Sequence, residues 1–147
     1  MTMLDHRLDP ARVALKIGLG LGPFLAGLDK FFNLLADWPH YVSPLVAGLL
    51  PVSPQTFMYV VGVIEMAVGL AILTQWTRLG SYVAMVWLCC IALNSVAGGF
   101  FDIAVRDIEM AIAAYTLARL TEVAEAAVRA AVPARSGTEA SRLSSAA

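Results

Sequence analysis

Charged residues are scarce in this 147-residue chain. Only 14% of its residues are Asp, Glu, Lys or Arg, whereas a soluble domain carries about 25%. The net charge is −1, from 10 basic and 11 acidic residues, so bulk charge offers no attraction to a polyanion. We therefore expect no nucleic-acid partner, and the shortage of charge excludes a large water-soluble catalytic domain.

Histidine and cysteine are also scarce, which limits the cofactors that the chain could bind. His6 and His40 fall outside the long apolar runs, so no such run offers an axial ligand to haem. Cys89 and Cys90 are adjacent within an apolar run, which is neither a CxxC redox pair nor a zinc pattern. We expect no metal and no intrinsic cofactor. We interpret the cysteines as small side chains packed in a membrane helix, and a redox role is the alternative.

Apolar residues are abundant instead, at 59% of the chain with a mean hydropathy of +0.74. A membrane-spanning helix needs about 20 apolar residues. The sequence predicts spans over residues 11–35, 56–74, 79–98 and 102–120. The connections QWTR and GGFF are short enough to force antiparallel neighbours. The predicted fold class is therefore all-α, an integral membrane four-helix bundle with up-down topology.

A proline-rich segment separates the first two predicted spans. Four prolines in ADWPHYVSPLVAGLLPVSPQ leave no room for a spanning helix. We expect an interfacial or re-entrant segment, with Trp38 and Tyr41 at headgroup depth.

The two ends of the chain differ from its apolar middle. Residues 1–10 are polar, and Pro10 suits the first turn of a helix that begins near Ala11, so we expect an N-terminal tail. Residues 121–147 are rich in Ala and Ser. We expect the last helix to continue to about Ala131, to stop at Pro133, and to be followed by a disordered tail.

The placement of basic residues predicts the orientation in the membrane. Cytoplasmic loops carry an excess of Lys and Arg. With four spans, the basic residues of the N-terminal region, of the QWTR turn and of the C-terminal region fall on one side. The proline-rich segment and the GGFF turn contain neither Lys nor Arg. The sequence therefore predicts a multi-pass protein of the bacterial inner membrane with both termini in the cytoplasm.

A few polar residues remain within the predicted spans, in what we expect to be one layer of their outer half. Charges inside a span are costly and tend to face the bundle interior in pairs. The candidate intramembrane polar site comprises Lys30, Glu65, Asn94, Arg106, Asp107 and Glu109.

Helical spacing suggests how these residues face one another. Lys30 continues a row of small residues at four-residue steps from Gly18 through Gly22 and Ala26, so we expect this row to pack against a neighbouring helix.

Similar spacing applies to the second and fourth spans. Glu65 shares a face with Gly62 and Gly69. Arg106 could bond Asp102 or Glu109 along its own helix, whereas Asp107, about 100° away, could meet a different neighbour.

Two interpretations of this polar layer follow from the residues alone. It could be a structural ion-pair network that fixes the register of the helices and has no substrate. It could also line a pocket that holds a quinone headgroup, a proton path or a small anion. The excess of acids over bases in the layer favours a functional role, because at least one acid could then be protonated at neutral pH.

The pattern resembles the DoxX-like family of small four-span bacterial membrane proteins. The resemblance covers roughly Arg12 to Leu120 and is carried by Arg12 at the start of the first span, by GPFLAGLDKFF with Lys30, by VIEMAVGLAIL with Glu65, and by an acid in DIAVRDIEMA.

The resemblance implies a membrane subunit or anchor that couples a soluble redox enzyme to the quinone pool. Quinone is then the cofactor that the site could bind, any enzyme activity is at most that of a non-autonomous subunit, and the partners are membrane lipid and a soluble redox enzyme. The sequence leaves open whether the chain is an oligomer. The alternatives are a small proton-coupled transporter with Glu65 as the carrier acid, and a structural assembly factor without a substrate.

Overall fold

A computed structural model shows an all-helical chain. It describes the backbone of residues 3–144 and the side chains of residues 8–130, and this part of the chain contains no strand. The elements in chain order are α1 (Met3–Asp29), the 3₁₀ helix η1 (Trp38–Tyr41), α2 (Pro44–Leu49), α3 (Pro54–Leu73), α4 (Thr77–Ala97) and α5 (Phe101–Ser144).

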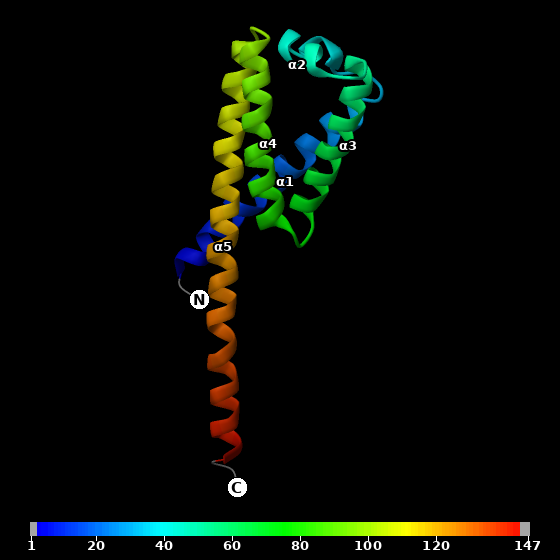
Figure 1. Cartoon of the computed structure of the whole chain (residues 1–147). Helices are drawn as coiled ribbons and strands as arrows, with labels where there is room; N and C mark the ends of the chain where they lie inside the picture. Colours follow the sequence, from blue (N-terminus) through cyan, green and yellow to red (C-terminus); the bar gives the residue numbers. More distant parts are fainter. Residues whose placement is uncertain (1–2, 145–147) are drawn as a thin grey trace.

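The long helices form two closely packed pairs. α3 lies against α1, and α5 lies against α4, with smaller contacts between α3 and α4 and between α1 and α5. α1 runs obliquely from the α5 side to the α3 side, and α2 lies over the far end of the bundle between α3 and α4 (Figure 1). The chain ends both lie toward the end that holds the α3–α4 turn, and α5 extends well beyond it (Figure 1). Four long helices in alternating directions agree with the predicted up-down order.

Two apolar clusters fill the interior. The larger one joins all four long helices and contains Leu19, Val68, Ile72, Ala84, Leu88, Ala111, Ala114 and Leu117. The smaller one lies under η1 and α2 and contains Val42, Met58 and Val61, with Trp38 and Trp87 packed against them. The proline-rich segment therefore closes one end of the bundle.

Glycines bring α1 and α3 into backbone contact. A Cβ atom added to Gly27 would lie 2.5 Å from the Gly62 carbonyl oxygen, and one added to Gly69 would lie 2.5 Å from the Gly20 carbonyl oxygen. The predicted shared face of Gly62, Glu65 and Gly69 is confirmed, since all three are buried. Small residues without side-chain bulk allow this approach.

The row predicted on α1 is wrong for its first members. No heavy atom lies within 4 Å of a Cβ added to Gly18 or Gly22. Each four-residue step turns a helix about 40° past a full revolution, so the row drifts off the contact face. Gly20 and Gly27 are seven residues apart and return to nearly the same face.

Both predicted helix ends differ from the structure. α1 begins at Met3 rather than near Ala11, and α5 continues to Ser144 rather than stopping at Pro133. A proline removes one backbone hydrogen bond from a helix, and the flanking turns can still keep helical dihedral angles. The predicted disordered tail thus falls on helical residues, apart from residues 145–147, which lie outside the described part.

The helix of the first predicted span also ends earlier than expected. α1 stops at Asp29 instead of continuing to residue 35, and Asn33 adopts a positive φ of 52°. The Asp29 carboxylate accepts hydrogen bonds from the backbone N–H groups of Leu34 and Leu35, at 3.1 and 3.0 Å. The Asp29 side chain therefore supplies hydrogen-bond acceptors to the turn that follows α1.

Among the residues whose side chains are described, three helices are long and apolar enough to cross a membrane: Leu8–Asp29, Pro54–Leu73 and Thr77–Ala97. α5 is not among them, because charged residues lie at both ends of its apolar stretch, four of them within its first nine positions and others from Arg119 onward. Large apolar side chains are exposed on the outside of the helices, including Leu21, Leu25, Val63, Leu70 and Leu93. A surface of this kind suits lipid contact.

Candidate functional site

The centre of the candidate site is an ion pair between Lys30 and Glu65. Lys30 Nζ donates to Glu65 Oε2 at 2.6 Å, and the two side chains are only 4% and 8% exposed. Glu65 lies on α3 beside Gly62, and Lys30 follows directly after the last residue of α1. The glycine contact brings the two backbones close enough for this pair to be enclosed.

Trp38 and Asp29 surround Lys30 on the other side. The Lys30 ammonium lies 3.7 Å from the centre of the Trp38 ring, a cation–π arrangement. The Trp38 indole N–H donates to Asp29 Oδ2 at 2.8 Å. The same carboxylate that ends α1 therefore also fixes the aromatic ring over the lysine.

Two buried polar atoms near this pair have no hydrogen-bond partner among the described residues. They are Trp87 Nε1 and Asp107 Oδ2. The Trp87 N–H lies close to the Glu65 carboxylate but short of regular hydrogen-bond geometry, and Asp107 is near enough to interact with Glu65 electrostatically. An unpaired buried donor and an unpaired buried acceptor are costly in a protein interior. They are groups that a bound polar molecule could satisfy.

Asp107 lies in this interior because it is on the buried face of α5. It is only 2% exposed, and it belongs to a buried row with Ala104, Ala111, Ala114 and Ala118. Steps of three or four residues place these side chains on one helix face. That row of small residues is the sequence signal that identifies Asp107 as the inward acid of α5.

Arg106 and Glu109 lie on the outside of α5 instead. The Arg106 side chain is 60% exposed, and Glu109 is exposed as well. Arg106 donates to Asp107 Oδ1 from Nε at 3.1 Å and from Nη2 at 2.8 Å. The predicted bond to Asp102 or Glu109 is wrong, because the long arginine side chain bends sideways to the buried neighbouring acid.

Asn94 binds the backbone of the proline-rich segment. Its Nδ2 donates to the Tyr41 carbonyl oxygen at 2.8 Å, and its Oδ1 accepts from the Ser43 N–H at 3.0 Å. The rings of His40 and Tyr41 also pack edge-on against Phe100 in the α4–α5 turn. Asn94 thus attaches this segment to the end of α4.

The structure brings together Lys30, Glu65 and, at longer range, Asp107. It places Asn94 in a separate contact, and Arg106 and Glu109 on the surface. Asp29, Trp38 and Trp87 were not among the predicted site residues. The contacts of Trp38 depend on the turn over residues 30–37, which no helical spacing describes.

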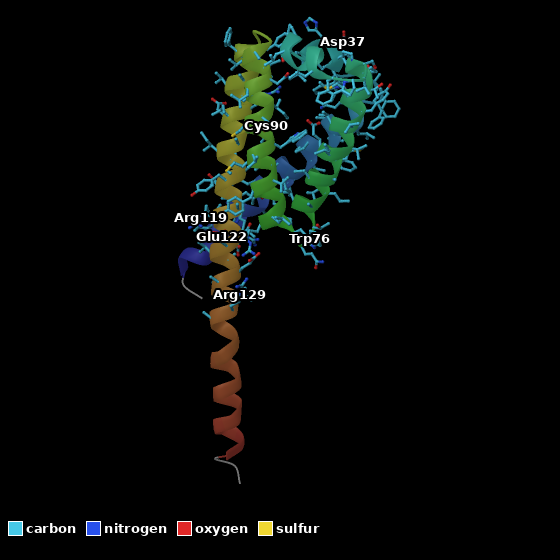
Figure 2. All side chains as sticks on the ribbon, viewed as in Figure 1. Asp37, Trp76, Cys90, Arg119, Glu122 and Arg129 are labelled. Atoms are coloured by element: carbon cyan, nitrogen blue, oxygen red, sulfur yellow. The ribbon has the colours of Figure 1, made fainter. Side chains whose placement is uncertain are left out.

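Other features lie apart from this cluster. A surface hollow of about 640 Å³ lies beside the α3–α4 turn, and one of about 120 Å³ lies between the start of α1 and α5; neither is lined by Lys30, Glu65 or Asp107. Within the described part of the chain, no group of His, Cys, Asp and Glu side chains could hold a metal ion. Cys89 is half-buried against the large cluster, and Cys90 is exposed on α4 (Figure 2).

Comparison with known proteins gives no relative for this chain. No family model, no curated protein and no solved structure matches it. The candidate site is therefore argued from its own geometry.

Proposed function

We propose that this chain is an integral protein of the bacterial inner membrane that crosses the bilayer four times, with α5 as the fourth span and both termini in the cytoplasm. α5 packs against α4, and Arg119 and Glu122 on α5 lie toward the same end of the bundle as Trp76 in the α3–α4 turn (Figure 2). That end also carries Arg12, Lys16 and Arg78, as the positive-inside rule requires of a cytoplasmic face.

We further propose that the protein is a DoxX-like membrane subunit that couples a soluble redox enzyme to the quinone pool. The observation that carries this proposal is the enclosed Lys30–Glu65 pair with the unpartnered Trp87 N–H and Asp107 oxygen near it. A quinone headgroup presents two carbonyl oxygens that accept hydrogen bonds, and its reduced form presents hydroxyl groups that donate them. Lys30 and Trp87 offer donors for the first form, and Asp107 offers an acceptor for the second.

Quinone binding is tested with the full chain in lipid nanodiscs. Trp38 and Trp87 lie at the site, so short-chain ubiquinone or menadione bound there quenches tryptophan fluorescence in a saturable way. In the double variant Lys30→Met/Glu65→Leu, which removes the pair without leaving one charge alone, we expect at least tenfold weaker binding. Arg129→Ala, on the exposed extension of α5, is the matched control. Equal quenching of wild type and double variant would reject the site.

A soluble redox partner is tested by gentle purification from the native membrane. The proposal expects an enzyme of that kind to co-purify, and to lose quinone reduction when the chain is absent. Purification with neither an enzyme nor bound quinone would contradict the coupling role.

Proton-coupled transport is the second candidate, and the burial of Glu65 on α3 favours it. In proteoliposomes with an imposed pH gradient, a carrier acid at this position requires that Glu65→Gln abolish flux. Unchanged flux in that variant would reject transport through Glu65. If paired neutral replacements of Lys30 and Glu65 preserve every measured activity, the structural assembly role is favoured instead.

A further inference from the structure

The outward face of α5 carries charges that the bundle does not cover. Asp102, Val105, Arg106, Glu109 and Ile112 are all exposed, and their spacing places them along one side of the helix. Val105 and Ile112 are each 61% exposed. The surface is thus a mixture of apolar side chains and charges.

Such a face is poorly suited to lipid. Charged side chains within a span are costly unless they pair or meet water. Among the described residues, no side-chain hydrogen bond or salt bridge involves Glu109, and the Arg106 side chain remains 60% exposed even with Asp107 bound. α5 is also the one long helix that lacks a sufficiently apolar window of spanning length. A protein surface would cover this face better than acyl chains.

We propose that a second copy of this chain covers it, in a dimer whose two-fold axis runs along the membrane normal through the α5 face. In this arrangement Arg106 of each copy binds Glu109 of the other. Three residues rise about 4.5 Å along a helix, which is within the reach of an arginine side chain. The interface is isologous, because the same two residues supply both halves of two equal ion pairs.

The charges of this face favour a second copy as the occupant. Arg106 and Glu109 are opposite in sign and three residues apart, so each can lie beside the other residue of an identical face. Asp102, the remaining charge of the face, lies in the first turn of α5, at the end of the helix. A guanidinium has five N–H donors, and its recorded bonds to Asp107 start from Nε and Nη2. It can therefore bind Glu109 of the second copy without releasing Asp107.

Charge exchange between two differently tagged chains tests the dimer. In lipid nanodiscs or mild detergent, we expect Arg106→Glu and Glu109→Arg each to weaken self-association at least tenfold, because each places like charges opposite one another. Mixing the two variants places opposite charges at both contacts, so we expect the mixed dimer to form within threefold of the wild-type affinity. Arg129→Glu, whose side chain is 74% exposed on the extension of α5, is the control that leaves association unchanged.

A second readout locates the interface. With Cys89 and Cys90 replaced by Ala and a copper–phenanthroline oxidant added to native membranes, Ile112→Cys should form a disulfide-linked dimer, and Leu21→Cys on the exposed side of α1 should not. Failure of the mixed variants to associate better than either alone would overturn the proposal, as would capture of a different membrane protein by Ile112→Cys.

The dimer rests on the proposed membrane span of α5. Extraction of membranes with alkali distinguishes a failure of the dimer from a failure of the membrane proposal. A wild-type chain that stays in the membrane and is monomeric overturns the dimer alone. Release of the wild-type chain by alkali overturns the membrane proposal and the dimer with it.

Discussion

The α1–α3 pair and the α4–α5 pair pack in different ways. α1 and α3 meet backbone to backbone at Gly27 and Gly62, and they enclose the Lys30–Glu65 ion pair. The buried apolar residues of α4 and α5 are mostly alanine, and polar contacts such as Arg78–Glu125 lie at the edge of this pair. The first pair thus encloses an ion pair of two buried charges, whereas the second buries mainly alanines and one acid, Asp107, whose partner Arg106 is exposed.

Removal of one buried charge from the α1–α3 pair should lower the stability of the protein most strongly. Lys30→Met leaves Glu65 without its partner, and breaking a buried pair in this way costs about 3–5 kcal/mol. We expect that loss in the free energy of unfolding, measured by denaturant titration in detergent micelles. The double variant Lys30→Met/Glu65→Leu should lose less than the single variant. A double variant that loses more stability than Lys30→Met would show that the two charges do not stabilise each other.

A methyl group at the glycine contact should have the next largest effect. In Gly27→Ala the new Cβ lies 2.5 Å from the Gly62 carbonyl oxygen, so the helices must separate. Overpacking of this kind costs about 1–3 kcal/mol. Gly22→Ala is the control on the same helix, since nothing lies within 4 Å of its Cβ, and it should unfold like wild type. If both variants unfold alike, backbone contact does not hold this pair together.

Loss of the Asn94 amide should loosen the connection between the two pairs. Asn94→Leu removes two hydrogen bonds and leaves the Tyr41 carbonyl and the Ser43 N–H unpaired, which costs about 1–3 kcal/mol. We expect faster hydrogen exchange at the Ser43 amide. Leu93→Ala, at a side chain that is 71% exposed, should leave that exchange unchanged. Equal protection in Asn94→Leu would mean that other contacts hold the proline-rich segment.

The smallest effect is expected at the edge of the α4–α5 pair. The Arg78 and Glu125 side chains are 49% and 36% exposed, and exposed ion pairs contribute about 0–1 kcal/mol. Arg78→Ala should therefore unfold almost like wild type in the same titration. A loss as large as that of Lys30→Met would remove the distinction between the two pairs.

The sequence predicted the central helices well and their ends poorly. The predictions over 56–74 and 79–98 agree with α3 and α4 to within two residues at each end, because the proline-rich segment and the short QWTR and GGFF turns bound them. The start of α1 and the end of α5 were wrong because each was predicted from a proline, and a proline penalises a helix without forbidding it. Whether a helix continues past one depends on the surrounding residues as a whole.

The candidate site was predicted in part for a similar reason. Glu65 was found through the phase of Gly62 and Gly69, which fixes the buried face of α3. Lys30 was predicted from the row of Gly18, Gly22 and Ala26, although Gly18 and Gly22 lie off the contact face. The charges of α5 look alike in sequence, and only its alanine row separates Asp107 from Arg106 and Glu109. The contact of Trp38 with Lys30 depends on an irregular turn, for which local spacing has no rule.

The position of Lys30 just beyond the end of α1 has a consequence for biosynthesis. Its acid partner follows 35 residues later in the chain. A chain made from its N-terminus therefore presents the ammonium before the carboxylate exists. A lysine in the middle of α1 would wait unpaired in hydrocarbon, whereas one at its end can stay at the water interface through its long side chain. In the proposed membrane arrangement, the ion pair closes when α3 inserts, and the insertion of α3 is then the step that completes α1.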